Sequence, residues 1–247
     1  MSLPVHLVDS LAGVSVGDLV TVEGDEAHHA VAVRRLRVGE QVVLTDGSGR
    51  SVTGAVTDTG KRVFSVEASS VEELPRPSPS FVVVQALPKG DRGELSVEVL
   101  TEIGVDQVVP WAASRSVAVW KGERATKSLA RWRSTAREAA KQSRRSWHPT
   151  VTELSTTAEV AELVAGADLA VVLHEEAGAP LAGLPVPASG TVVVVVGPEG
   201  GLSPDEVATF VAAGAVSVRL GAEVLRTSTA GVAACAALLA RTARWGG

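Results

Sequence analysis

The sequence lacks several features that mark common classes of protein. It contains a single cysteine, Cys235, so no intrachain disulfide can form, and the surrounding residues 233–239 are apolar. We interpret Cys235 as a buried structural thiol and expect no redox chemistry. Residues 1–10 lack a basic segment followed by a long apolar run, and no apolar run is long enough to span a bilayer. We therefore expect a cytoplasmic protein.

Familiar catalytic motifs are also missing. The five histidines are scattered and only one cysteine accompanies them, so we expect no metal site. There is no Gly-x-Ser-x-Gly elbow, which disfavours hydrolase chemistry, although a triad defined only by geometry stays open. A phosphate-binding P-loop and a dinucleotide Gly-x-Gly-x-x-Gly motif are both absent.

The composition and patterning predict two soluble domains. The chain has 247 residues, of which 45% are apolar and 21% charged. Up to about Val71, short alternating runs separated by turn signals indicate a small all-β module over residues 1–73, which we expect to form a barrel. Residues 74–80 contain three prolines in alternation, which is typical of an extended linker.

Residues 81–247 show strands alternating with helical stretches, which predicts an α/β domain with a largely parallel sheet. The expected strands and helices are 81–87, 95–103, 107–111, 124–142, 169–173, 191–196, 205–213, 217–220 and 228–241.

Two loops near the C-terminus are the most informative feature. Apolar residues 192–196 lead into Gly-Pro-Glu-Gly-Gly at 197–201, and Leu220-Gly221 leads into Val-Leu-Arg-Thr at 224–227. Glycines after a buried strand allow backbone groups to approach a ligand, and ligands of parallel sheets bind at the carboxyl ends of strands. A tight strand-to-helix turn is the alternative explanation. Ser203 reads as a helix N-cap followed by acidic residues, which would repel a phosphate.

Positive charge is concentrated in one segment. The net charge is −5, yet residues 115–145 carry +8, so the rest of the chain carries −13. Such a patch is typical of a protein that binds a polyanion. Four of the five tryptophans lie in or beside this segment and could stack on unpaired bases. The alternative is a solvated basic helix face with core tryptophans.

Taken together, these motifs resemble the RsmE group of 16S rRNA uridine-N3 methyltransferases, within the knotted SPOUT superfamily, which use S-adenosylmethionine. The resemblance covers the full length of the chain. It is carried by residues 29–37, 46–49, 87–92, 101–105 and 138–143 and by both C-terminal loops. Gly-Pro-Glu-Gly-Gly followed about twenty residues later by Leu-Gly and Val-Leu-Arg-Thr is specific to such enzymes.

The resemblance implies a PUA-like β-barrel for RNA over residues 1–73, a linker over 74–80, and a SPOUT methyltransferase domain with a deep trefoil knot over 81–247. It also implies a homodimer whose cofactor pocket lies near the subunit interface. The expected partner is 16S rRNA within the small ribosomal subunit, with no membrane and no metal. A related SPOUT enzyme acting on tRNA or on a ribose 2′-hydroxyl, and a non-catalytic RNA-binding ribosome-assembly factor, are the alternatives.

The resemblance also implies roles for individual residues. The expected catalytic residues are Arg226, which could hold a uracil carbonyl, and Glu199, which could accept a proton or bind the ribose. Ser228 stands where many family members carry Glu, and Val99 where relatives often carry Lys. The expected S-adenosylmethionine-binding residues are Leu173, His174, Gly197, Pro198, Glu199, Gly200, Gly201, Leu220, Gly221, Val224, Leu225, Arg226, Thr227 and Thr229. The expected RNA-binding residues are Arg34, Arg35, Arg37, Lys89, Arg92, Arg115, Arg131, Arg144 and Arg145.

Overall fold

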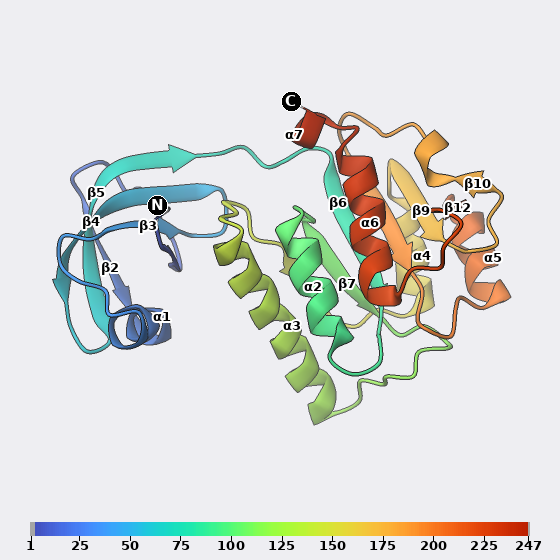
Figure 1. Cartoon of the computed structure of the whole chain (residues 1–247), viewed down its shortest axis with the longest axis horizontal. Helices are drawn as coiled ribbons and strands as arrows, with labels where there is room; N and C mark the ends of the chain where they lie inside the picture. Colours follow the sequence, from blue (N-terminus) through green and yellow to red (C-terminus); the bar gives the residue numbers. More distant parts are fainter. Residues whose placement is uncertain (1–2, 247) are drawn as a thin grey trace. The chain divides into compact units, whose positions relative to one another are not determined.

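A computed structural model describes residues 3–246 (Figure 1). These residues form two compact units. The N-terminal unit comprises the residues up to Arg76 together with Lys141–His148, and the C-terminal unit comprises Pro77–Ala140 together with the residues from Pro149 on. Within the described residues, no helix combines the length and the apolar character that a membrane crossing requires.

The N-terminal unit is built on a five-stranded sheet with the order β1-β3-β4-β5-β2. The alternating pattern predicted from the sequence is visible in β2, where Val20 and Val22 are buried and the residues between them are exposed. One face of the sheet covers a core that includes Leu44 and Phe64. The strands are β1 (Val5–Leu7), β2 (Leu19–Glu23), β3 (Gln41–Thr45), β4 (Arg50–Thr59) and β5 (Val63–Glu73).

The expectation of an all-β module is wrong in one respect. A short α-helix, α1 (Gly24–His28), follows β2 and continues into a π-helical turn at His29–Val33. Ala27 and Ala30 are both fully buried. Their spacing of three residues places them on one helical face, and this was the sequence signal for the missed helix.

The segment Lys141–His148 belongs to the N-terminal unit, whereas the sequence-based division assigned it to the C-terminal domain. It packs along the turn between β3 and β4. The Gly49 N–H donates to the Ser146 carbonyl at 2.8 Å, and the His148 N–H donates to the Gly47 carbonyl at 2.9 Å. Pairing between distant segments leaves no local pattern in the sequence. The sequence-based division therefore could not assign this segment to the N-terminal unit.

Glu26 is the centre of a buried ionic group in the N-terminal unit. Its Oε1 lies 3.1 Å from His6 Nδ1, and its Oε2 accepts a hydrogen bond from Lys141 Nζ at 2.8 Å. Burial raises the pKa of the Glu26 carboxyl, but the hydrogen bonds and charges of His6 and Lys141 outweigh it and lower the pKa to about 2.

This pKa predicts a pH-dependent contribution to stability. Because the carboxyl has a lower pKa when the chain is folded, its contribution is present above pH 4.5 and is lost as the pH falls toward 2. We expect Glu26→Gln to lower the free energy of unfolding by about 3 kcal/mol at pH 7. In urea unfolding at several pH values, the difference from wild type should shrink below pH 4. A difference that stays constant down to pH 2.5 would contradict this assignment.

The C-terminal unit is built on a seven-stranded sheet with the order β10-β12-β9-β11-β6-β7-β8. Every pairing in it is parallel, which confirms the predicted α/β class. The strands are β6 (Ser80–Ala86), β7 (Gln107–Trp111), β8 (Thr150–Val151), β9 (Leu169–Leu173), β10 (Ala179–Pro180), β11 (Thr191–Val196) and β12 (Val216–Arg219). The helices are α2 (Arg92–Glu102), α3 (Glu123–Gln142), α4 (Thr157–Ala165), α5 (Pro204–Ala212), α6 (Thr227–Leu239) and α7 (Ala243–Gly246), with a 3-10 turn at Leu181–Gly183.

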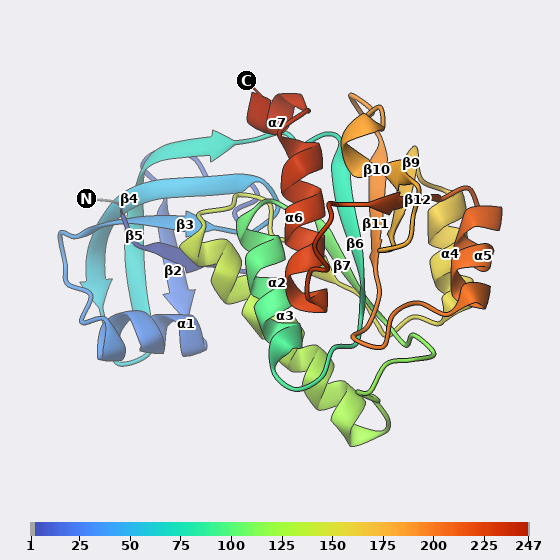
Figure 2. The same ribbon diagram turned by 45° about the vertical axis from the view of Figure 1, so that its right-hand side comes forward.

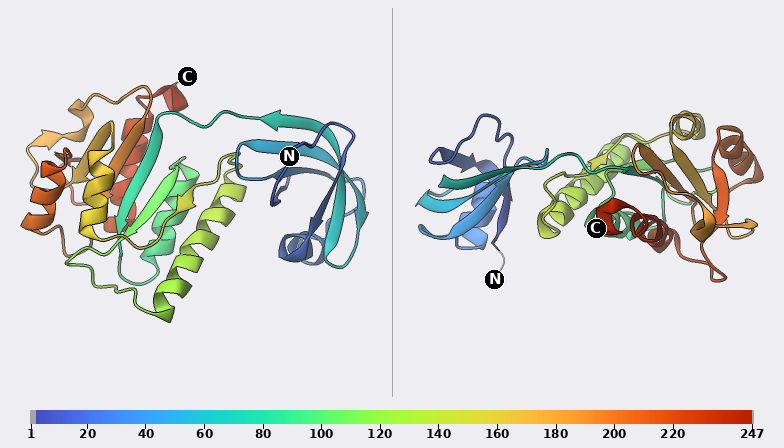
Figure 3. Two further views of the ribbon diagram at one scale, coloured as in Figure 1. Left: turned by 180° about the vertical axis from the view of Figure 1, so that it is seen from behind. Right: turned by 90° about the horizontal axis from the view of Figure 1, so that it is seen from above.

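Helices cover both faces of this sheet, which explains why its strands read as unbroken valine runs. Successive side chains of a strand point to opposite faces, so β6 sends Phe81 and Val83 into one core and Val82 and Val84 into the other. The first core is closed by α2, α3 and α6 (Figure 2). The second is closed by α4 and α5, which lie in front of the sheet in the view from behind (Figure 3).

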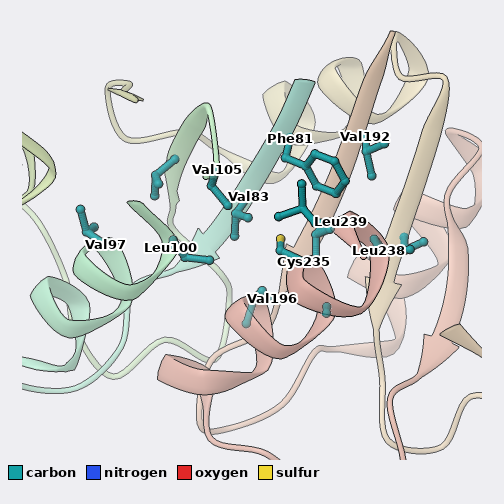
Figure 4. Close-up of a cluster of buried hydrophobic side chains, with 14 of the residues drawn as sticks. Phe81, Val83, Val97, Leu100, Val105, Val192, Val196, Cys235, Leu238 and Leu239 are labelled. Carbon is teal, nitrogen blue, oxygen red and sulfur yellow. The ribbon is translucent and has the colours of Figure 1, made fainter. Parts of the chain in front are cut away.

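Cys235 lies in the first core, among Phe81, Leu238 and Leu239 (Figure 4). Burial raises the pKa of its thiol to about 12, so almost none of the nucleophilic thiolate exists near neutral pH. The interpretation of Cys235 as a structural thiol is confirmed. The trefoil knot implied by the resemblance stays a prediction.

Candidate functional site

A cavity of about 340 Å³ opens in the C-terminal unit. It lies at the carboxyl ends of the adjacent strands β12, β9 and β11. The glycine loop at 197–201 follows β11, the second loop at 220–226 follows β12, and His174 follows β9. The structure thus brings together the two loops that the sequence singled out, at the sheet edge where ligands of such folds bind.

Nearly all of the expected cofactor-binding residues line this cavity. The residues in its wall are Leu173, His174, Gly197, Pro198, Glu199, Gly201, Leu220, Gly221, Val224, Leu225, Arg226 and Thr227. Gly200 and Thr229 lie outside the wall. The Thr229 hydroxyl donates to the Arg226 carbonyl at 3.2 Å, within the first turn of α6.

Close packing and backbone conformation favour glycine at three positions of the first loop. A Cβ at Gly197 would lie 3.0 Å from Leu202 Cγ, and one at Gly200 would lie 3.0 Å from the Arg115 carbonyl oxygen. Gly201 has a φ of +71°, which L residues rarely adopt. The alternative of a tight strand-to-helix turn therefore accounts for these positions without a ligand.

Gly221 in the second loop is different. A Cβ there would meet no atom closer than 3.6 Å, and its φ is outside the left-handed region. The fold of the chain therefore does not demand glycine at this position. Since Gly221 lies in the cavity wall, its missing side chain keeps the cavity open.

Hydrogen bonds from neighbouring segments hold the glycine loop and the start of α5 in place. Ser203 is the predicted N-cap of α5, and with Glu206 it forms a capping box. Glu206 also accepts a hydrogen bond from the Ser114 N–H at 2.7 Å. Burial raises the pKa of Glu206, but the N–H donors of Ser114 and Ser203 outweigh it and lower the pKa. Arg115 Nη1 donates to the Leu202 carbonyl at 3.2 Å. The guanidinium of Arg115, an expected RNA-binding group, is thus engaged in positioning the loop.

The two expected catalytic side chains differ in their surroundings. Glu199 Oε1 accepts a hydrogen bond from the Lys89 N–H at 3.1 Å and lies 3.6 Å from Arg92 Nη1. Arg226 is the N-cap residue of α6, yet its guanidinium makes no capping bond, and it has no ion-pair or hydrogen-bond partner within residues 3–246. Arg226 is therefore available to a ligand, whereas one oxygen of Glu199 is already bound.

The backbone of the second loop is also available. From Leu220 to Arg226, none of the N–H groups donates to a carbonyl or side chain of the described chain. Unpaired backbone donors beside a cavity are the groups that recognise the polar parts of a ligand.

Thr227 joins the two loops. Its Oγ1 donates to the Gly197 carbonyl at 2.7 Å and accepts a hydrogen bond from Gln85 Nε2 at 3.0 Å. The hydroxyl thereby ties the end of β11 to the start of α6 and to the buried side chain of β6.

We expect Thr227→Val to lower the free energy of unfolding by about 1–3 kcal/mol, because the buried Gln85 amide and the half-buried Gly197 carbonyl lose their shared partner while the side-chain shape is kept. Thr229→Val is the matched control, since its hydroxyl bonds only within its own helix and is exposed. Chemical unfolding measures both. Equal stability of the two variants would contradict the bridging role of Thr227.

The expected RNA-binding residues fall into two groups, one on each unit. Arg34, Arg35 and Arg37 are exposed after the π-helical turn, and Arg144 and Arg145 belong to the N-terminal unit as well. On the C-terminal unit, Lys89 and Arg131 are exposed, and Arg92 lies in the cavity wall with the guanidinium near Glu199.

Some wall residues were not identified from the sequence. Glu175, Arg219 and Glu223 line the cavity beside the residues that were named. Glu175 directly follows His174, Arg219 directly precedes Leu220, and Glu223 lies between Gly221 and Val224. Their nearness to the predicted positions was the sequence signal that could have identified them. Within residues 3–246, no group of three or more histidine, cysteine or acidic side chains is arranged to hold a metal ion.

Comparisons with known proteins point to one family. Residues 75–239 match the family described as an RNA methyltransferase domain, and residues 22–68 match the RNA methyltransferase PUA domain. Ribosomal RNA small subunit methyltransferase E of Mycobacterium tuberculosis is 44% identical over 242 residues, covering 96% of this chain and 92% of the relative. The protein of the same name from Bacillus subtilis is 31% identical, with 90% of each chain covered.

Solved structures agree along the whole chain. The ribosomal RNA small subunit methyltransferase E of Neisseria gonorrhoeae, bound to S-adenosyl methionine, superimposes with a TM-score of 0.86 at 28% identity over 98% of each chain. A Legionella pneumophila protein described as a methyltransferase, in complex with SAM, gives 0.89 at 26% identity, covering 98% of this chain and 99% of that one.

Proposed function

Because the chain belongs to the ribosomal RNA small subunit methyltransferase E family, we propose that it transfers a methyl group from S-adenosylmethionine to N3 of a uridine in 16S rRNA. The observation that carries the proposal is the cavity at the ends of β12, β9 and β11, whose wall holds both motif loops.

The residues of this cavity fit S-adenosylmethionine. Its volume of about 340 Å³ is within the usual range for small-molecule sites. The open α-carbon of Gly221 and the unpaired N–H groups of residues 220–226 suit an adenine and ribose held through backbone groups. The apolar side chains of Leu173 and Leu225 in the wall suit the faces of the adenine ring.

When bound, the cofactor supplies an electrophilic methyl group on a sulfonium centre. The chain must then orient the uracil and stabilise the negative charge that develops when N3 loses its proton. Arg226 holds a uracil carbonyl and stabilises this anion, because its guanidinium is free and lies in the wall. Glu199 accepts a proton or binds the ribose through Oε2, since Oε1 is held by the Lys89 N–H.

RNA binding is assigned to both units. Arg34, Arg35, Arg37, Arg144 and Arg145 on the N-terminal unit and Lys89, Arg92 and Arg131 on the C-terminal unit contact the rRNA, whose phosphates attract a positive surface. The reaction takes place in the cytoplasm on the small ribosomal subunit, and the active form is a homodimer with a knotted catalytic unit. The match of residues 22–68 to an RNA methyltransferase PUA domain supports RNA as the substrate.

The test is transfer of labelled methyl from S-adenosylmethionine to purified small subunits, large subunits and tRNA. We expect label only in the small subunit. Label in tRNA would move the protein to a different branch of RNA methyltransferases. Cofactor binding without transfer to any of the three would favour a non-catalytic RNA-binding role.

A further inference from the structure

A second hollow lies along α3 in the C-terminal unit, and the proposed reaction leaves it unexplained. Its volume is about 600 Å³. The α3 residues in its wall recur every three or four positions, so they share one helical face. The residues that line it are Trp120, Ala125, Thr126, Leu129, Ala130, Arg133, Ser134, Arg137, Glu153 and Leu154.

The inner part of this groove is apolar and aromatic. Trp120, Leu129 and Leu154 all belong to or pack against the first core of the unit. Trp120 is half-buried, and its ring meets Trp132 edge to face with centroids 5.0 Å apart. This contact fixes the orientation of the indole ring while leaving part of it exposed in the groove.

The rim of the groove is positively charged. Arg133 is held in place by its bonds to the Val151 carbonyl at 3.0 Å and to Glu153 at 2.9 Å. Arg137 is exposed and pairs only loosely with its neighbour Glu138, at 3.5 Å. On the other flank of α3, a separate hollow is lined by Arg124, Lys127 and Arg131 together with Glu123, which lies 3.7 Å from Lys127 Nζ. The exposed side of α3 therefore carries cations at the rim of the aromatic groove and in the neighbouring hollow.

We propose that this groove binds an unpaired nucleotide of the rRNA, with its base against Trp120 and the neighbouring phosphates along Arg124, Lys127 and Arg131. The inference rests on the proposed function and adds a base subsite distant in sequence from the motif loops. Charge complementarity favours RNA as the occupant, because four exposed cations line the groove and the neighbouring hollow of α3: Arg124, Lys127, Arg131 and Arg137. The indole ring of Trp120 favours a ligand that carries a base over one that carries phosphate alone, because every base has a face that can stack on it.

The first test compares two probes that differ in whether they carry bases. A nine-nucleotide oligouridine and inorganic polyphosphate of similar charge are titrated into the full chain at several salt concentrations. Trp120→Leu keeps an apolar contact with Trp132 but removes the stacking surface. We expect it to weaken oligouridine binding at least about 5-fold, with little effect on polyphosphate and with an unchanged salt slope. Equal loss for both probes, or no loss, would overturn the base subsite.

Charge variants test the rest of the surface. Arg137→Gln should reduce the slope of log K against log salt by about one for oligouridine. Ala130→Glu places a carboxylate in the groove at an exposed helix position and should weaken binding further. The matched control is Ala212→Glu, an exposed alanine on α5, which covers the opposite face of the sheet. A groove that bound an acidic peptide and not oligouridine would refute the assignment.

Methyl transfer to small subunits separates this inference from the proposed function. If wild type methylates 16S rRNA and Ala130→Glu has the same KM as Ala212→Glu, the groove is not an rRNA subsite and the proposed function stands. If wild type methylates no RNA but binds oligouridine through Trp120, the proposed function fails and the subsite stands. The subsite predicts a higher KM for Ala130→Glu, with cofactor affinity equal to that of wild type.

Discussion

Arg226→Ala should lower the rate of methyl transfer by about 100- to 1,000-fold at saturating substrate and cofactor, the range seen when one preorganised donor to a developing anion is removed. The physical reason is that the guanidinium lies in the cavity wall and makes no bond to the described chain. Removing the guanidinium should therefore change the stability of the fold little. The transition state, however, loses a cationic hydrogen-bond donor.

The measurement is single-turnover methyl transfer together with calorimetric cofactor binding. Cofactor affinity should change by less than the rate, because the uracil anion is the group that Arg226 stabilises. Arg226→Lys is the informative companion, since it keeps the charge but loses the planar fork, and it should recover only part of the rate. A rate close to wild type for Arg226→Ala would remove the residue from the mechanism.

Gly221→Val should lower the affinity for S-adenosylmethionine by about 10- to 100-fold without lowering the melting temperature of the free protein. A Cβ at this position meets no protein atom closer than 3.6 Å, so the fold accommodates a side chain. The same side chain would project from the cavity wall and occupy space that the ligand needs.

Gly178→Val is the matched control for this prediction. Gly178 is also exposed, has open space around its α-carbon, and lies outside the cavity wall. Cofactor affinity by calorimetry and melting temperature are measured for both variants. Full cofactor affinity in Gly221→Val would show that the ligand does not approach this part of the wall.

Much of the fold could be predicted from local patterns, and the exceptions have identifiable causes. The valine-rich strands β6, β9 and β11 and the amphipathic helix α3 were recognised because their periodicity is strong. The helix α4 was missed although Thr156 and Glu159 form a capping box at its start. The packing of Lys141–His148 against the N-terminal unit could not be predicted, because its backbone bonds to the turn between β3 and β4, far away in the sequence.

The candidate site likewise has features that local sequence patterns predict and features that they do not. Convergence of the two loops followed from the rule that parallel strands end at one edge of the sheet. The reason given for the first-loop glycines was incomplete, because Gly197, Gly200 and Gly201 serve the turn itself. The hydrogen bonds that link Thr227 Oγ1 to Gln85 and Gly197 depend on three elements that meet in space. No local sequence pattern predicts such a contact.

The most direct test of the central claim is the identity of the methylated nucleoside. Small subunits are incubated with the protein and labelled S-adenosylmethionine, the 16S rRNA is digested to nucleosides, and the labelled product is identified by chromatography and mass. We expect 3-methyluridine at a single site, with the yield greatly reduced by Arg226→Ala. Label on a ribose 2′-hydroxyl or on another base would contradict it.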